Sequence, residues 1–450
     1  MSAPTRAIGP SSLAVLLLLA GCAGGSALRV SDITPEAIPG LEQARAQSPE
    51  DATTLTRLGV AYFKADRYAD ARQALDSAVA RDARNGTAAI YLGMATEALG
   101  DFPAARMAYQ HYIDISRSGE LRETARRRLA LMGRHELEFS ARQALAQEAS
   151  LTQQPPEENT VAVMPFGYSG TNAQIQPLSR GFAQLVVTDL AKSRQIRVLE
   201  RERMQAIVNE LHLADSGSAD PQTALRSGRL LRAARVVQGT IAEQGSDLRV
   251  DAAVVDVASA GVAASAGATD ALNRLFDLEK QVVLSIFTNL GIQLSDQERA
   301  AIDQRPTQNL QAFLAYSRGL EAEDRGDYSG ARDAFGEAAG LDPSFRAATQ
   351  SAGAASDLNI AAQQTSVQVE AVVVQNQGAE GGGGVSDDAK KDALQGALNN
   401  VNPTPTGIQN SEQGQQQGQP PARQPGADVT NTQGTAPPTG TVVIVIRRPL

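Results

Sequence analysis

The stretch TRLGVAYFKADRYADARQALDSAV, residues 56–79, decides the fold of the N-terminal part of the chain. Small and apolar residues recur at helical spacing before and after Asp66, which indicates two helices joined by a turn. The pattern returns 34 residues later, with Gly100-Asp101 at the turn, and again far downstream, with Gly326-Asp327 at the turn. Three copies in one frame favour a true repeat over a generic amphipathic hairpin.

The period and pattern of these copies resemble tetratricopeptide repeats, which are helix–turn–helix units of 34 residues. Two adjacent repeats are fewer than the roughly three needed for autonomous stability. We therefore expect residues 119–150 to act as a cap, and helices around 300–314 and 344–358 to flank the third copy. The frame positions are Leu58, Gly59, Tyr62, Ala71, Leu75 and Ala78, then Leu92, Gly93, Ala105, Tyr109 and Tyr112, then Gly319, Ala331, Phe335, Ala338 and Pro343.

Residues 158–295 follow a different pattern, in which short apolar runs alternate with helical periodicity. A turn at Gly245 joins the last two predicted strands, and Asp220-Pro221 predicts a helix start. The order βαβαββα predicts an α/β or α+β domain with helices against a small sheet. The predicted strands are 160–166, 196–200, 235–241 and 248–257, and the predicted helices are 178–190, 204–211, 221–231 and 271–290.

Four segments of this region, AVMPF (162–166), RVLER (197–201), VVQGT (236–240) and VVDV (254–257), resemble the curli-secretion lipoproteins, the CsgG-type family, with FlgO-type lipoproteins as relatives. The resemblance implies a lipidated protein and a homo-oligomer through this domain. Members of that family insert long hairpins into the outer membrane as a pore. Here only a short link, 258–269, is expected before the last helix, which disfavours a pore made by this domain alone and leaves a periplasmic ring or adaptor.

The N-terminus predicts export and lipidation. Arg6 and the apolar run 13–20 suit a signal peptide, and the run is too short to span a membrane. Leu19-Ala20-Gly21-Cys22 resembles the lipobox of bacterial lipoproteins, with Cys22 as the lipidated thiol. Cys22 is the only cysteine, so an internal disulfide is impossible. Ala23 stands where Asp would signal inner-membrane retention, so we expect an outer-membrane anchor that faces the periplasm.

Charge and motifs exclude several function classes. The net charge of −9 disfavours nucleic acid as a partner. The three histidines, His111, His135 and His212, lack metal-ligand spacing, and the sequence contains no nucleotide-binding or catalytic motif. We therefore expect no catalytic residue, no metal, no cofactor and no enzymatic activity.

Two charged segments and the chain ends carry further expectations. Arg122, Arg126–Arg128 and Arg134 either grip anionic lipid or an acidic partner or, as favoured, form a solvated helix face. Glu200–Arg203 is expected to pair at the surface. Residues 22–50 are expected to be a tether, because Pro35 and Pro39 discourage helix.

The C-terminal part changes in composition after about residue 360. Ser366–Val374 is a candidate strand, and 359–440 is expected to be low-complexity and disordered. Residues 441–450 are either a strand that adds to a sheet edge, of this protein or of a partner, or an unstructured end.

These expectations combine into a multidomain lipoprotein. The predicted parts are a signal peptide (1–21), a tether (22–50), repeats with a cap (51–150), the CsgG-like domain (158–295), a further repeat (300–358), the low-complexity segment (359–440) and the terminal strand (441–450). Bound to the bilayer by its acyl anchor, the protein is expected to scaffold an envelope or secretion complex, with a protein partner in a repeat groove lined by Tyr62, Tyr91, Tyr109 and Tyr112. The alternatives are a curli-type secretion-channel subunit and a periplasmic ligand- or glycan-binding protein.

Overall fold

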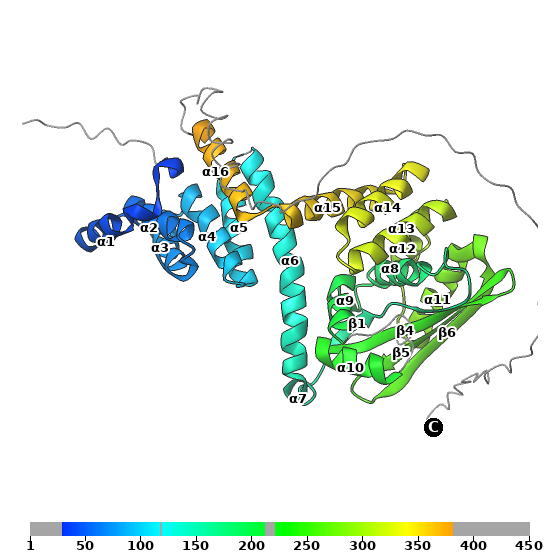
Figure 1. Ribbon diagram of the computed structural model, residues 1–450. Helices are drawn as coiled ribbons and strands as arrows, with labels where there is room; N and C mark the ends of the chain where they lie inside the picture. The colour runs from blue at the N-terminus through cyan, green and yellow to red at the C-terminus, as the bar shows by residue number, and fades with distance from the viewer. Residues whose placement is uncertain (1–28, 118, 212–220, 381–450) are drawn as a thin grey trace, which may run out of the picture. The chain divides into compact units, whose positions relative to one another are not determined.

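The computed structural model describes residues 29–117, 119–211 and 221–380 (Figure 1). The predictions on the signal peptide, Cys22, His212 and the segment from 381 to 450 lie outside the described residues. Within the described stretches, no helix is both long enough and apolar enough to cross a membrane.

The N-terminal part is helical from its first described residues. The elements are η1 (Val30–Asp32), η2 (Pro35–Ala37), α1 (Ile38–Gln47), α2 (Ala52–Lys64), α3 (Tyr68–Arg81), α4 (Gly86–Ala98) and α5 (Phe102–Ile115). The expected tether is thus corrected over residues 30–47. Pro39 lies in the first turn of α1, where the missing N–H costs no helical hydrogen bond. Val30 and Ile33 are buried in the core of the repeats.

Each repeat holds its two helices together by the same close crossing. A Cβ atom on Gly59 would lie 2.4 Å from Leu75, one on Gly93 would lie 2.8 Å from Tyr109, and one on Gly319 would lie 2.4 Å from Phe335. The partners are 16 residues apart in every copy. The missing side chain therefore admits a large apolar one from the second helix. The other predicted frame residues are buried as well, except Pro343, which lies in a turn.

The cap is a single long helix, α6 (Glu120–Ala146), followed by the short α7 (Glu148–Leu151). The N-terminal half of α6 packs on α5, and Leu121, Ala125 and Met132 belong to the repeat core. Its C-terminal half contributes Leu137 and Ala141 to the core of the next domain. One helix therefore belongs to two hydrophobic cores.

The central domain is built on one mixed sheet in the order β3-β1-β4-β5-β6, with β2 paired to β4. β1, β2 and β3 run parallel to their neighbours, and β4, β5 and β6 form an antiparallel meander that turns at Gly245, where φ is +66°. The strands are β1 (Glu157–Val163), β2 (Gly167–Ser169), β3 (Arg197–Val198), β4 (Ala233–Gln244), β5 (Asp247–Asp256) and β6 (Gly261–Ala271).

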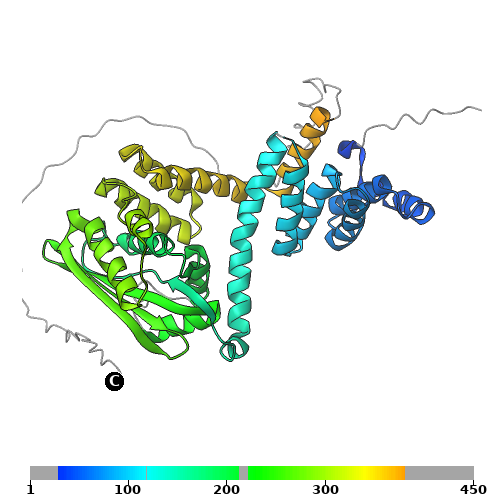
Figure 2. The same cartoon turned by 180° about the vertical axis from the view of Figure 1, so that it is seen from behind.

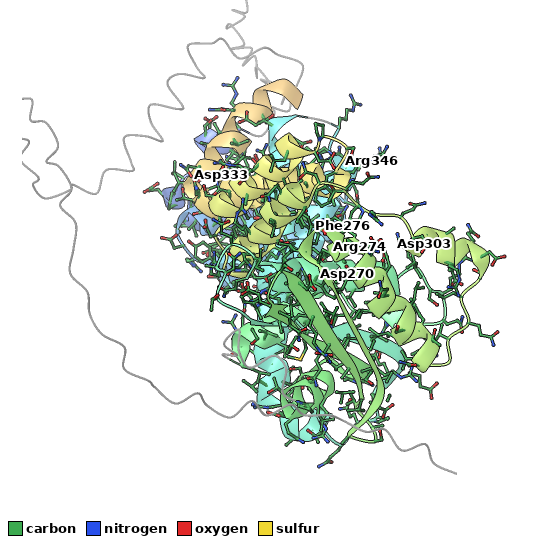
Figure 3. All side chains as sticks on the ribbon, turned by 90° about the vertical axis from the view of Figure 1, so that its right-hand side faces the viewer. Asp270, Arg274, Phe276, Asp303, Asp333 and Arg346 are labelled. Carbon is green, nitrogen blue, oxygen red and sulfur yellow. The ribbon has the colours of Figure 1, made fainter. Side chains whose placement is uncertain are left out.

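β6 corrects the expected short link at 258–269. Its sequence, GVAASAGATDA, consists mainly of Gly and Ala, which are depleted in strands, so propensity gives no signal there. The strand forms because β5 offers it a ladder along its whole length. Just after the strand, Arg274 pairs with Asp270 at 3.4 Å (Figure 3).

Helices cover both faces of the sheet, and alternate strand residues serve different cores. Val161, Val163 and Val237 face α8 (Leu178–Leu190) and α11 (Leu275–Asn289), which η3 (Leu272–Arg274) precedes. Ala162, Met164 and Val236 lie in the core with α9 (Arg201–Glu210) and α10 (Pro221–Leu231). This alternation is the period of two that strands require.

The C-terminal helices are α12 (Asp296–Ile302), α13 (Leu310–Asp324), α14 (Tyr328–Leu341), α15 (Arg346–Gln363) and α16 (Ser366–Glu380). The third repeat, α13 and α14, shares its core with the sheet domain: Phe313 of α13 meets Phe276 of α11 with ring centroids 5.3 Å apart.

The expected strand at Ser366–Val374 and the expected disorder of 359–380 are wrong. Val369 and Val373 stand four residues apart and are buried on one helical face, and Thr365 and Gln368 bond to each other's backbone N–H at the helix start. A run of valines fits a strand by propensity, but here tertiary packing selects the helix.

The close helix crossing in the third repeat predicts that two Gly→Ala substitutions change the free energy of unfolding in opposite directions. Gly319→Ala drives a methyl group into the rigid ring of Phe335, and overpacking should lower the unfolding free energy by about 1–3 kcal/mol. Gly336→Ala is the matched control, because Gly336 lies inside α14 with no atom within 4 Å of an added Cβ. It should raise stability by up to about 1 kcal/mol through helix propensity. Urea unfolding of both variants measures this, and equal shifts would contradict the crossing.

Candidate functional site

Tyr91, one of the four tyrosines predicted to line the partner groove, contacts a helix of the same chain, α16. α16 packs against α6 and η1, and Figures 1 and 2 show it beside α6 from both sides. Val369 and Val373 are each 1% exposed and belong to the repeat core. We call the part of η1, α2, α4 and α6 that α16 covers the α16 seat.

Polar contacts fix the register of α16 in this seat. The carboxylate of Glu370 accepts a hydrogen bond of 3.0 Å from the Tyr91 hydroxyl of α4. It also pairs with the Lys64 ammonium at the end of α2, at 3.3 Å. The same ammonium donates to the carbonyls of Val30 and Ile33 at 2.8 and 2.9 Å. Lys64 therefore joins η1 to α16.

Arg128 of α6 holds the chain just before α16. Its guanidinium donates to the carbonyl of Ala361 at 2.9 Å and to that of Gln364 at 3.2 Å, at the C-terminal end of α15. It also pairs with Glu97 of α4, which accepts a further hydrogen bond from the Tyr109 hydroxyl. A cation at a helix C-terminus meets both the unpaired carbonyls and the negative end of the helix dipole.

Most arginines of the run 122–134 neither form a lipid-binding surface nor lie on a solvated helix face. Besides Arg128, Arg127 pairs with Asp357 of α15 at 3.0 Å, and Arg134 pairs with Glu323 of α13. Arg122 donates to the carbonyl of Ile113, and Arg126 pairs with Glu123 on the surface of α6. Most of these charges connect α6 to other helices.

A second charged cluster joins the sheet domain to the third repeat. Arg201, at the start of α9, is 7% exposed and pairs with Asp324 and, at 3.0 Å, with Glu323, both at the end of α13. Arg180 of α8 pairs with Asp324 at 3.1 Å. Burial works against the charge of Arg201, but the carboxylates around it outweigh that cost and raise its pKa. The expected surface pairing of Glu200–Arg203 is therefore wrong for Arg201.

A third group of charges is buried inside the sheet domain. Glu279 of α11 is fully buried, and its pKa is raised to about 8, first by burial and then by the nearby charge of Asp189. Lys280 pairs with Asp189 of α8 and lies 3.1 Å from a Glu279 oxygen, in a geometry too poor for a hydrogen bond. Burial thus favours the protonated form of Glu279, while Lys280 offsets the charge of Asp189.

The remaining predicted residues lie apart from these clusters. Tyr62 donates its hydroxyl to Glu42 of α1, and Tyr112 is buried within the second repeat. His135 packs its ring on Phe102 at 5.0 Å, and the Nε2 atom of His111 is buried without a hydrogen bond. Among the described residues, no three His, Cys, Asp or Glu side chains are arranged to hold a metal ion.

Comparisons with known proteins support both resemblances. The family model described as curli production assembly/transport component CsgG matches residues 142–275, and a tetratricopeptide repeat model matches residues 34–95. The chain thus contains a CsgG-like domain and tetratricopeptide repeats, as the sequence predicted. No curated protein matches the sequence.

Among solved structures, the C-terminal domain of LpoB from Salmonella enterica is similar at 10% identity, over 28% of this chain and 93% of that domain. The TM-score is 0.21, which is too low to inform the fold.

The Arg201 cluster predicts a large loss of stability when one carboxylate is removed. Asp324→Asn leaves Arg201 and Arg180 short of a shared partner in a buried place, which typically costs about 3–5 kcal/mol. Asp333→Asn is the control, because Asp333 on α14 is 67% exposed and pairs at the surface (Figure 3). That change should cost less than about 1 kcal/mol. Comparable losses in chemical unfolding would argue against a buried network.

Glu279 predicts a specific pH dependence of stability. Its pKa rises from 4.5 to about 8 on folding, so between these values the folded state holds a proton that the unfolded state releases. The stabilisation is complete below about pH 4.5 and is lost as pH rises through 8, at no more than about 1.4 kcal/mol per pH unit. Glu279→Gln should flatten this slope, whereas Glu337→Gln at an exposed site should not. Unfolding midpoints from pH 5 to pH 8 measure it, and a slope that survives in Glu279→Gln contradicts it.

Proposed function

We propose that the chain is a lipid-anchored scaffold of the bacterial envelope, which binds protein partners through its repeats and assembles through its CsgG-like domain. The carrying observation is that one chain combines tetratricopeptide repeats with a domain matching a curli assembly/transport component. The Leu19–Cys22 lipobox supports an acyl anchor. No catalytic residue, metal or cofactor enters this proposal.

The ion pairs described above support a scaffold in which repeats and sheet domain act together. The Arg201 cluster joins α9 and α8 to α13, and Arg134 joins α6 to the same helix. These ion pairs join elements far apart in the sequence and so support a scaffold in which the third repeat and the sheet domain are held together. In this role the protein forms homo-oligomers through the sheet domain.

A secretion-channel subunit is the second candidate, because β6 replaces the expected short link. β4, β5 and β6 have 12, 10 and 11 residues, so the premise of a short link no longer disfavours a channel. Ring-shaped particles with single-channel conductance in lipid bilayers would support the channel, and purified particles without conductance would reject it.

A glycan- or ligand-binding role has weaker support. The cavity between α6, α9 and α13 holds about 60 Å³, whereas ligand pockets usually hold about 300–1,000 Å³. The larger opening of about 850 Å³ lies at the start of α13, outside the sheet domain.

The anchor predicts a change in fractionation. Cys22→Ser removes the thiol that accepts the lipid, so the protein should leave the membrane fraction, and cross-links to envelope proteins should be lost. Ala23→Asp is the control: it keeps the thiol, so the protein should stay membrane-bound but move from the outer to the inner membrane. Mass spectrometry of the mature N-terminus checks the modification directly. An unmodified sulfur on wild-type Cys22 would reject the anchor.

A further inference from the structure

The α16 seat is built for a carboxylate-bearing helix. Lys64 is held in place by two backbone carbonyls, and the buried Tyr91 ring leaves its hydroxyl directed at Glu370. Without α16, the ammonium and the hydroxyl would each lose an acceptor, and the apolar surface under Val369 and Val373 would meet water. The seat therefore requires an occupant with two aliphatic side chains four residues apart and a carboxylate directly after the first.

α16 is fully buried along a narrow face only. Of its described side chains, Val369 and Val373 are buried, whereas Val367 is 41% exposed and Val372 is half-buried. Its ion pair with Lys64 is partly exposed to water. Such a helix opens more easily than helices with continuous buried faces.

The junction before α16 lies between two helices that are held by different contacts. Arg128 binds the end of α15, and Leu358 and Ala361 of α15 are buried in the repeat core. Gln364 and Thr365 then lead into α16, which starts its own hydrogen-bonded cap. The two hydrogen bonds from Arg128 to α15 use the carbonyls of Ala361 and Gln364 and no side chain of α16, so they can persist when α16 leaves the seat.

We propose that α16 is an internal occupant of the partner-binding seat, and that a partner binds by displacing it. The partner is a protein with a short amphipathic helix of the stated pattern: an aliphatic residue, an acidic residue after it, and a second aliphatic residue four positions after the first. This inference rests on the proposed function, since it specifies which surface of the repeats takes the partner and by what chemistry. The seat is then closed until a competing helix arrives.

A peptide of residues 364–376, labelled with a fluorophore, is the probe of the seat. In the wild-type mature chain, α16 competes at an effective concentration on the order of 1 mM, which weakens peptide binding about tenfold or more. Val369→Asp with Val373→Asp should release α16 and make peptide binding at least tenfold tighter. Val367→Asp is the matched control on the exposed side of α16 and should leave binding weak.

A charge exchange tests the seat itself. In the released chain, Lys64→Glu should abolish binding of the wild-type peptide, and a peptide with Glu370→Lys should restore it. Circular dichroism and melting show whether each variant folds. Should the double valine variant unfold, Glu370→Lys in the chain serves as a milder release, and the wild-type peptide should again bind more tightly than to the unaltered chain.

Two outcomes would overturn the inference. A folded, released chain that fails to bind the peptide shows α16 to be a permanent part of the repeat core, and equal affinities of wild-type and released chains show that α16 closes nothing. Either result leaves envelope cross-links of the wild-type chain unaffected. If the peptide binds as expected but the wild-type chain gives no cross-links to envelope proteins, the scaffold role is rejected and the displacement of α16 from its seat still stands.

Discussion

A buried guanidinium stays charged, so its burial is tolerated only where carboxylates offset the lost hydration. Arg201 places this constraint on the packing of α9 against α13. The side chain starts α9 of the sheet domain, yet its acceptors stand at the end of α13, more than 120 residues later. Separation of the two would leave the Arg201 guanidinium and the two nearly buried carboxylates of Glu323 and Asp324 without each other, which costs far more than the loss of a surface pair. The third repeat is therefore an integral layer of the sheet domain, which its shared aromatic core also indicates.

α6 solves the problem posed by having two repeats where about three are needed for stability. One half of α6 covers α5 and the other half covers α9. The helix therefore contributes side chains to the repeat core and to the core of the sheet domain. Its arginines then gather the ends of helices from distant parts of the sequence. Arg128 and Arg127 reach α15, and Arg134 reaches α13. The arginine run resembles a basic surface patch in the sequence, but most of its side chains form ion pairs or hydrogen bonds with other helices of the chain.

The repeats and most of the sheet domain could be predicted from the sequence, because their signals lie in the spacing of nearby residues. The repeats were legible because Gly59, Gly93 and Gly319 each stand a fixed distance before a large apolar residue, and the sheet domain because β1, β4 and β5 are strongly apolar. β6 was missed because a partner strand, and not its own residues, imposes its conformation. The predictions for Arg201 and for α16 were wrong for a related reason. The sequence around Arg201 gives no sign of its partner Asp324, and the sequence around Val369 gives no sign that Lys64 and Tyr91 contact this helix. Long-range partners decide burial, and burial decides the role of a charge or a valine run.

The return of α15 to α6 has a consequence for the order of biosynthesis. Arg128 and the carbonyl of Ala361 are separated by 233 residues. At about 5–20 residues per second, the ribosome needs roughly 10–50 s to make the intervening chain. For that interval the nascent repeats lack the apolar cover that Leu358 and Ala361 of α15 and Val369 and Val373 of α16 give to their core. The helices that complete the repeat core are therefore among the last described parts of the chain to be made.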